Sequence, residues 1–230
     1  MSIDKSQIRD AATVIVLRDT DTTPRILMGQ RGAKAAFMPN KFVFPGGAVD
    51  AADAGVPLGT ALPPACATRL DDDSPRGLGP ALAAAAVREL YEETGQILGT
   101  PGDWPDAPPD WHAFAASGHL PHAGALRFVF RALTPPGRPR RFDARFFTVA
   151  AEALATDPDD FSAASDELSH LLWVELAEAR KFDMPFITEV VLSEVQSQLH
   201  GAPAPTSVPF FKNDDEESLF LRLRDHPMTD

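Results

Sequence analysis

The sequence predicts a mixed α/β fold in which a small mixed sheet lies between helices. Short apolar segments rich in β-branched residues, such as 11–17 (AATVIVL), have the length and composition of buried strands. Two longer segments, 81–94 and 185–199, repeat apolar residues at helical spacing. The chain length of 230 residues suits one domain with elaborations, so we expect residues 1–230 to form a single domain.

The first part of the chain indicates a hairpin that leads into a glycine turn. Its strand-like segments are residues 11–17, 25–31 and 41–44. Turn-forming residues from Asp19 to Pro24 separate the first two segments, which are therefore expected to pair. Residues 32–41 are expected to form a loop, and the third segment runs into Gly46-Gly47.

A loop excursion and a helix come next. Residues 54–80 mix Gly, Pro and Ala with Asp71-Asp72-Asp73, which predicts a surface loop with one helical turn. We favour a solvated loop over a metal site for the three aspartates. Pro80 suits the first position of the helix 81–94. The packed face of that helix is predicted to consist of Ala83, Val87, Leu90 and Thr94.

The second half of the chain begins with another excursion, over about residues 100–125. Its amphipathic stretch from Trp111 to Ala116 is expected to cover the core, with a role in a substrate pocket as the alternative. Strands are then predicted at 126–133, 144–149 and 171–174. The helix that starts at Pro185 follows, and its apolar face is predicted to consist of Ile187, Val190, Val191 and Val195.

The end of the chain is expected to add a loop and a hairpin. Residues 201–207 form the predicted loop. Phe210-Phe211 and the segment 219–223 are expected to pair around a turn at 213–215.

Composition excludes several classes of function. The net charge of −12 argues against a general nucleic-acid surface. No apolar run approaches the ~20 residues of a membrane span, and the first residues lack the apolar core of a signal peptide. The single cysteine, Cys66, fits a reducing compartment. We therefore expect a cytoplasmic protein without nucleic-acid or membrane partners.

The segment 88–95 (RELYEETG) carries the strongest chemical signal. Glu89, Glu92 and Glu93 are spaced i, i+3 and i+4, so they share one face of a helix. Three carboxylates on one face repel one another unless a cation neutralises them, and Mg²⁺ prefers carboxylates together with substrate phosphates. The spacing predicts a metal-dependent site for a phosphorylated substrate. A solvated acidic face is the alternative.

Together with Phe44-Pro45-Gly46-Gly47, this segment resembles a Nudix box, G-x5-E-x7-R-E-U-x-E-E-x-G-U, in which U is aliphatic. The resemblance has three departures. Asp53 stands at a glutamate position, residues 54–87 replace a seven-residue spacer, and Gln96 occupies the last aliphatic position. A surface insertion between the glycine loop and the helix costs little in loop entropy.

Other segments narrow the resemblance to a subgroup that has an insert in the box and includes a coenzyme A diphosphatase. These segments are Phe37-Met38-Pro39, Val43 to Asp53, Leu133 to Pro136, Pro139 to Asp143 and Arg145-Phe146-Phe147. The resemblance implies an α/β/α sandwich. It also implies hydrolysis of a diphosphate bond, with coenzyme A or an acyl-CoA as the leading substrate.

The resemblance further implies roles for particular residues. Mg²⁺ or Mn²⁺ would be held by Glu89, Glu92, Glu93 and the Gly47 carbonyl. Arg88 would fix one of the glutamates, although an ordinary helix ion pair with Glu92 is the alternative. The general base would be a helical glutamate or Glu167, which otherwise is a plain loop acid.

The densest basic cluster of this acidic chain consists of Arg138, Arg140, Arg141 and Arg145. Such a cluster would suit the 3′-phosphate of coenzyme A. Solvated turn arginines with ion pairs to Asp143 are the alternative.

Two other functions stay open at this stage. ADP-ribose, a dinucleotide or a nucleotide sugar would be alternative substrates. A non-catalytic nucleotide sensor is the other possibility, although a pure binder needs no such acid cluster. In each case the partner is a small nucleotide. The sequence is compatible with a homodimer but does not give the oligomeric state.

Overall fold

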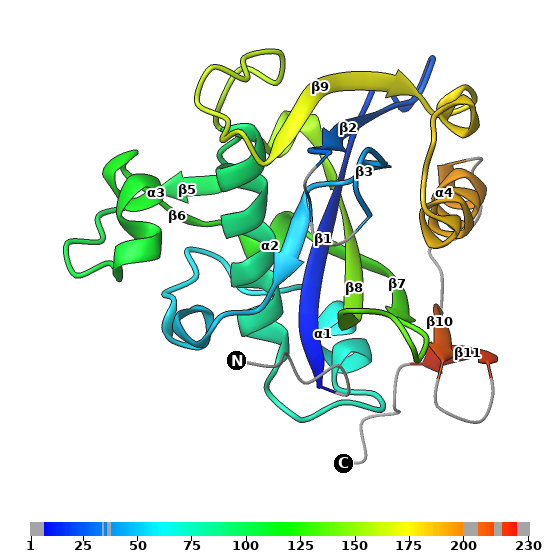
Figure 1. Cartoon of the computed structure of the whole chain (residues 1–230). Coiled ribbons are helices and arrows are strands. Elements are labelled where there is room, and N and C mark those ends of the chain that lie inside the picture. The colour runs from blue at the N-terminus through cyan, green and yellow to red at the C-terminus, as the bar shows by residue number, and fades with distance from the viewer. Residues whose placement is uncertain (1–6, 34, 36–37, 200–206, 214–217, 225–230) are drawn as a thin grey trace.

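The structure is a computed structural model that describes residues 7–33, 35, 38–199, 207–213 and 218–224. A twisted sheet forms its middle layer, with α2 on one side and α4 on the other (Figure 1). This arrangement confirms the predicted α/β/α sandwich. The predicted loop at 201–207 and the predicted turn at 213–215 fall largely outside the described residues.

The main sheet of the described chain has nine strands. Its strands are β1 (Ile8–Arg18), β2 (Arg25–Arg31), β3 (Phe42–Val43), β4 (Gly46–Ala48), β7 (Arg127–Leu133), β8 (Arg141–Ala150), β9 (Leu168–Glu175), β10 (Ser207–Asn213) and β11 (Ser218–Arg224). The order is β11-β10-β7-β8-β1-β2-β3, while β4 pairs with β1 and β9 pairs with β2. The β1–β8 and β7–β10 pairs are parallel, and the other pairs are antiparallel.

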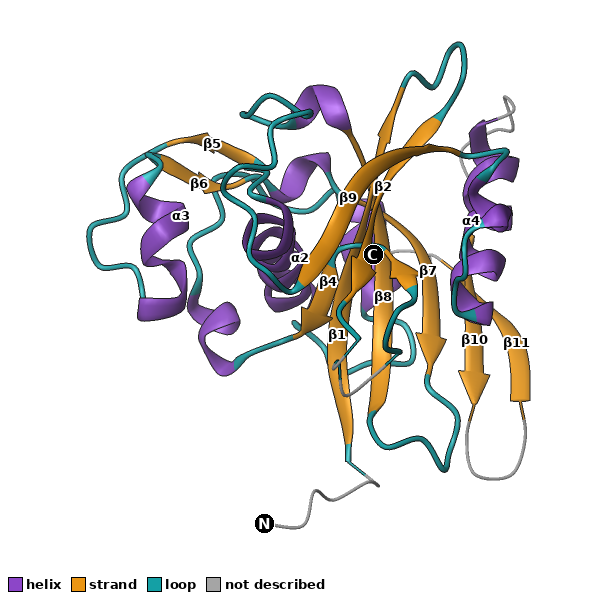
Figure 2. Cartoon of the chain, turned by 45° about the horizontal axis from the view of Figure 1, so that its top comes forward, coloured by secondary structure: helices purple, strands orange, loops and turns teal. Residues whose placement is uncertain are grey.

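The sheet is larger than the small sheet that the sequence predicts. The terminal hairpin of β10 and β11 extends it at one edge, and the glycine turn contributes β4 (Figure 2). Strands β8 and β9 also begin earlier than expected, because polar residues such as Asp143 and Ser169 continue the ladders. Alternation of apolar residues does not reveal such positions.

The helices are α1 (Pro64–Leu70), α2 (Gly79–Thr94), α3 (His112–Ala116) and α4 (Phe186–Leu199). The described chain also contains short 3₁₀ helices: η1 (Ala51–Gly55), η2 (Pro109–Trp111), η3 (Ala123–Ala125), η4 (Ala151–Ala153) and η5 (Ala179–Lys181). None of the described helices has both the length and the apolar character needed to cross a membrane.

Apolar side chains fill both spaces between the sheet and the helices. Val14 and Val16 of β1 belong to the core cluster that includes α2, whereas Ile15 and Leu17 belong to the cluster that includes α4. Successive strand residues point to opposite faces, which explains this division. The predicted packed face of α2 is buried as expected, from Ala83 to Thr94.

The first excursion, residues 54–80, contains α1 and is tied to the sheet by main-chain groups. Arg131 of β7 donates to the carbonyls of Asp72 and Asp73 over 3.2 and 3.0 Å. The Asp73 carboxylate accepts a bond from Lys212 of β10. The aspartates therefore anchor the excursion to neighbouring strands.

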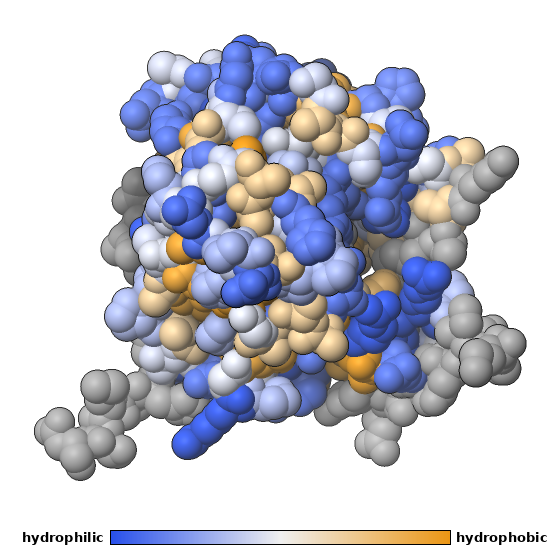
Figure 3. Space-filling view, turned by 90° about the vertical axis from the view of Figure 1, so that its left-hand side faces the viewer, coloured by the Kyte–Doolittle hydropathy of each residue, from blue (hydrophilic) through white to orange (hydrophobic). Residues whose placement is uncertain are grey.

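The second excursion, residues 100–125, forms a small layer outside α2. Strands β5 (Gly99–Pro101) and β6 (His119–Pro121) pair with each other and flank α3. Trp111 and Phe114 are fully buried, which confirms their predicted place in the core. On the face of the molecule that Figure 3 shows, small hydrophilic and apolar patches are intermixed.

Candidate functional site

The C-terminal half of α2 lies against the glycine turn that follows β3. The backbone N–H of Gly46 donates to Oε2 of Glu93 over 2.8 Å. A side chain at Gly47 would stand less than 3.0 Å from the Glu89 carboxylate, and one at Gly46 would meet the backbone of β1. Both glycines are required because the turn passes this close to its neighbours. Helix α2 then ends at Gly95, whose φ of 74° permits the left-handed cap.

Arg88 donates hydrogen bonds to three carboxylates of the acidic cluster. Its Nε and one terminal nitrogen each donate to a different oxygen of Asp53, both over 3.1 Å. The other terminal nitrogen donates to Glu89 over 2.9 Å and to Glu92 over 3.1 Å. Asp53 and Arg88 are both buried. The planar guanidinium therefore links Asp53 to two of the helical carboxylates in a fixed geometry.

Burial makes the helical carboxylates weak acids in this structure. Burial raises the pKa of Glu89 to about 7, against the opposing charge of Arg88. Burial likewise raises the pKa of Glu93 to about 8, and Glu89 and Glu167 add to the increase. The pKa of Glu92 is also raised, mainly by burial. Little solvent reaches Glu89 and Glu93, whereas 40% of the Glu92 side chain is exposed. A bound cation would favour the charged forms of all three acids.

Arg31 lies between Glu167 and the helical carboxylate of Glu93. Glu167 immediately precedes β9 and accepts a bond from Arg31 over 3.3 Å. Another nitrogen of Arg31 lies 4.0 Å from Oε1 of Glu93. More than half of the Glu167 side chain is exposed, whereas that of Glu93 is buried. Glu167 is thus a solvent-accessible acid next to a buried one.

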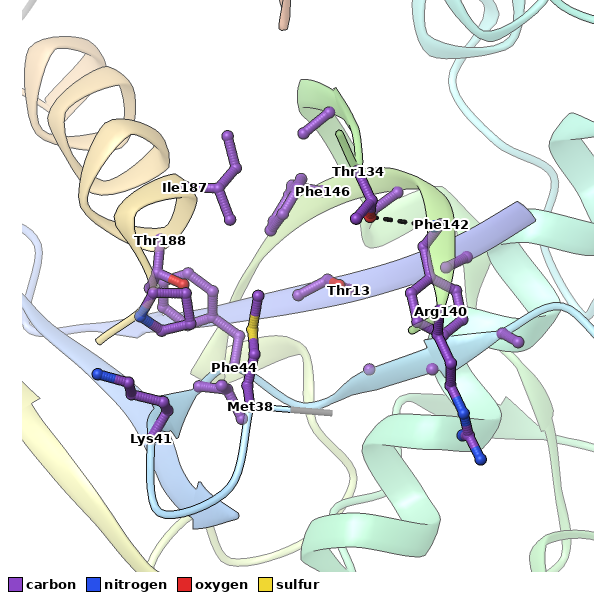
Figure 4. Close-up of a pocket in the computed structure, with 18 of the residues that line it drawn as sticks. Thr13, Met38, Lys41, Phe44, Thr134, Arg140, Phe142, Phe146, Ile187 and Thr188 are labelled. Atoms are coloured by element: carbon purple, nitrogen blue, oxygen red, sulfur yellow. Dashed lines mark hydrogen bonds between the residues drawn. The ribbon is translucent and has the colours of Figure 1, made fainter. Parts of the chain in front are cut away.

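A cavity of about 960 Å³ opens beside this cluster. Gly47, Glu89, Glu92 and Glu167 line its acidic part. Away from these acids, the cavity runs between the sheet and the start of α4. Figure 4 shows Ile187 and Thr188 there, opposite sheet residues such as Thr13 and Phe146, while Arg140 and Phe142 lie at the other end.

The four arginines of the predicted phosphate clamp separate into two groups. Arg138 and Arg140 line the cavity and are exposed. Arg141 is instead buried, and it donates to the carbonyls of Thr134 and Asn213. Arg145 is also buried, where it contacts Asp10 and Ser74. The described cavity lining includes neither of these two, because alternate residues of β8 face opposite ways.

A NUDIX domain model matches residues 8–194. The chain belongs to the NUDIX family. Curated relatives include a Caenorhabditis elegans protein provisionally named nudix hydrolase 7, which is 32% identical over 187 residues. That match covers 75% of this chain and 53% of the relative.

A second relative is the Gallus gallus protein acyl-coenzyme A diphosphatase NUDT19, 27% identical over 209 residues. The match covers 67% of this chain and 54% of that protein. The chain thus spans about half the length of both relatives. Among solved structures, a NUDIX hydrolase from Alicyclobacillus acidocaldarius superposes with a TM-score of 0.60 at 26% identity. It covers 86% of this chain and 99% of its own.

NUDIX hydrolases generally use divalent metal ions, and this NUDIX domain has donors suited to one. Within the described residues, Oε1 of Glu93 is buried and accepts no hydrogen bond, and its cationic neighbour, Arg31, lies 4.0 Å away, so a strong acceptor lacks a donor. Carboxylate and carbonyl oxygens are the ligands that hard divalent cations prefer. Within the described chain no three acidic, His or Cys side chains already converge as a metal site requires, because Glu89 and Glu92 turn toward Arg88.

Two residues of this NUDIX site escape sequence reasoning. Arg31 lies at the end of β2 and contacts Glu167, which is 136 positions away. Trp111 donates to Asp53 across 58 positions. Neither belongs to the motif, and contacts between such distant positions leave no local pattern. The only signal for Asp53 was its place in the box.

Proposed function

We propose that this NUDIX domain hydrolyses the diphosphate bond of coenzyme A or of an acyl-CoA. The observation that carries the proposal is the chemical asymmetry of the cavity. Acidic residues stand beside a space with the exposed Arg138 and Arg140 at one end and a mainly apolar lining at the other, where Lys41, the cation that Figure 4 labels there, is paired with Asp183. A diphosphate diester has two substituents, and those of an acyl-CoA differ in this same way.

The basic end suits the nucleotide half of the substrate. Arg138 and Arg140 are exposed, and they lie in the turn between β7 and β8. An arginine binds phosphate through two parallel N–H groups, which favours a 3′-phosphorylated ribose over one without that group. Phe142 beside Arg140 offers an aromatic surface at the same end.

The apolar end suits a pantetheine or acyl chain. Its side chains come from the sheet, the connection between β3 and β4, the segment before α4 and the first turn of α4. They include Phe44, Phe146, Met184 and Ile187. Such a surface is stabilised by covering it with uncharged carbon groups, at about 25 cal/mol for each Å² removed from water. Cleavage would give 3′,5′-ADP and a phosphopantetheine species.

The residues of the acidic part would divide the chemical work. When bound, Mg²⁺ or Mn²⁺ supplies charge neutralisation and activates water. Glu89, Glu92, Glu93 and the Gly47 carbonyl would hold the ion. Arg88 would keep Glu89 and Glu92 in position. Glu167, exposed at the cavity edge, would accept a proton from the attacking water.

A product assay by mass spectrometry tests the proposal. Coenzyme A, octanoyl-CoA, dephospho-CoA, ADP-ribose, NADH and a diadenosine polyphosphate are incubated with and without Mg²⁺ or Mn²⁺. We expect metal-dependent release of 3′,5′-ADP from the CoA substrates, lost in Glu93→Gln. Preference for ADP-ribose or a dinucleotide would replace the substrate assignment. Tight nucleotide binding without product would indicate a sensor.

The variant Arg140→Glu tests whether this arginine contacts the 3′-phosphate of the substrate. It should raise KM for coenzyme A by roughly tenfold and leave KM for dephospho-CoA nearly unchanged, since charge-assisted bonds are worth about 1.5–3 kcal/mol. Arg127→Glu, at an exposed position outside the described cavity lining, is the matched control. An equal effect on both substrates would exclude a 3′-phosphate contact.

A further inference from the structure

Trp111 lies outside the motif that carries the carboxylates, yet its indole contacts that motif. It ends η2 in the second excursion and is fully buried. Its Nε1–H donates to Oδ1 of Asp53 over 3.3 Å. An indole nitrogen can only donate, so a buried tryptophan needs an acceptor. Here the acceptor is the carboxylate that holds Arg88.

The Asp53 carboxylate accepts hydrogen bonds from three residues of the described chain. Arg88 contributes two N–H groups, and the backbone N–H of Asp50 donates to Oδ2 over 2.8 Å. Trp111 donates to Oδ1, the same oxygen that accepts from Nε of Arg88. Because every donor acts on one buried carboxylate, each restricts the rotation of that carboxylate. Removing the indole N–H would leave Asp53, and with it the Arg88 fork, less constrained.

An aromatic cluster fixes the indole relative to α2. Trp111 packs against Trp104 and Phe114, with ring centroids 5.6 and 5.4 Å apart. Phe114 in turn meets the edge of Tyr91 at 5.5 Å. Tyr91 belongs to the helix that carries the three glutamates. The excursion therefore packs against α2, the helix that carries Arg88.

We propose that Trp111 is a positioning residue for the acidic site, acting through Asp53 and Arg88. The second excursion would then be part of the catalytic apparatus and not only a cover for the core. This inference rests on the proposed function, because the positioned carboxylates are those that would bind the metal ion. It extends that function by assigning a residue outside the NUDIX box to it.

The decisive variant is Trp111→Phe, which keeps a ring in the cluster and removes the N–H donor. Trp173→Phe is the matched control, because it also removes an indole N–H donor, whose described acceptor is the carbonyl of Pro158 and not Asp53. Loss of a direct hydrogen-bond partner of a metal ligand typically costs about 10–100-fold in metal affinity or activity, and Trp111, which acts through Asp53 and Arg88, should have an effect at the low end of this range. We expect Trp111→Phe to weaken Mn²⁺ binding by about tenfold, measured by calorimetry, and to lower kcat similarly with KM unchanged.

Trp173→Phe should leave Mn²⁺ affinity and kcat near those of the wild type. Equal Mn²⁺ affinities in Trp111→Phe and the wild type would overturn the inference. A wild type that binds Mn²⁺ but cleaves no substrate would refute the proposed function alone, and the affinities would still decide the role of Trp111. A wild type that binds no Mn²⁺ would overturn both.

A double-mutant cycle tests whether the effect passes through Asp53. If it does, Trp111→Phe combined with Asp53→Asn should bind Mn²⁺ no more weakly than Asp53→Asn alone. Additive losses would overturn the inference. Should Asp53→Asn fail to fold, nuclear magnetic resonance gives a second test, since the chain has three tryptophans. The Trp111 indole N–H should exchange slowly with solvent, and fast exchange would contradict the hydrogen bond.

Discussion

The carboxylate of Glu89 occupies the space that a side chain at Gly47 would need. This contact explains why a glycine stands at the end of the turn. It also brings the main chain at Gly46 and Gly47 against Glu93 and Glu89. The relationship joins the two halves of the box across the 34 residues of 54–87.

Gly47→Ala should displace Glu89 and lower kcat by about 100-fold, because small misplacements of reacting groups cost about that much. The accompanying loss of stability from overpacking should stay near 1–3 kcal/mol. Steady-state kinetics and urea unfolding measure the two effects. Gly55→Ala is the control, since a Cβ there meets no atom of the described residues within 4 Å, its chain neighbours aside. Unchanged kcat in Gly47→Ala would mean that Glu89 has no need of this position.

Glu93→Gln should remove most of the thermal stabilisation by divalent metal. A ligand at 100 times its Kd stabilises the folded state by about 2.7 kcal/mol, so wild-type Tm should rise on addition of Mn²⁺. The variant lacks the buried charge that would attract the ion. Differential scanning fluorimetry records both Tm values. Glu152→Gln, at an exposed position in η4, should respond like the wild type.

Glu167→Gln tests the assignment of the base. A correctly placed general base contributes about 10²–10⁴-fold, so kcat should fall within this range while KM changes little. Asp166→Asn is the control, because Asp166 is an exposed acid one residue earlier in the same loop. If the two variants have the same kcat as the wild type, Glu167 is a plain loop acid and a helical glutamate takes the role.

Arg145→Ala should unfold more easily without any selective effect on substrate binding. The buried guanidinium contacts the part-exposed Asp10 and also Asp143, which Arg131 continues to hold, so the cost should lie below the roughly 3–5 kcal/mol of a fully buried pair. Urea unfolding measures this loss, and KM of the folded fraction should match that of the wild type. A selective rise in KM for coenzyme A would return Arg145 to the substrate site.

The sequence predicts this fold well wherever a local pattern carries the information. The hairpin of β1 and β2 follows from short apolar segments on either side of a turn cluster, and the packed face of α2 follows from helical spacing. The acidic cluster follows from the spacing of Glu89, Glu92 and Glu93. Residues of mixed polarity, such as those at the start of β8, gave no such signal.

The features of the site that the sequence does not predict depend on contacts between distant segments. Four arginines that lie within eight positions look like one cluster, yet β8 directs Arg141 and Arg145 away from the cavity. Arg31 and Trp111 join the site only because the sheet and the second excursion bring them there. Predicting these positions requires the strand register and the packing of the excursion.

The parallel pairing of β1 with β8 also sets an order of events during synthesis. The ladder joins Ile8 to Arg141 and continues to Leu17 and Ala150. When the first strand leaves the ribosome, its partner on this side has not yet been translated. Pairings between such remote positions form slowly, because a long loop must close first. Until then β1 exposes an apolar strand edge, so the nascent chain passes through a stage at which a holding chaperone would protect it from aggregation.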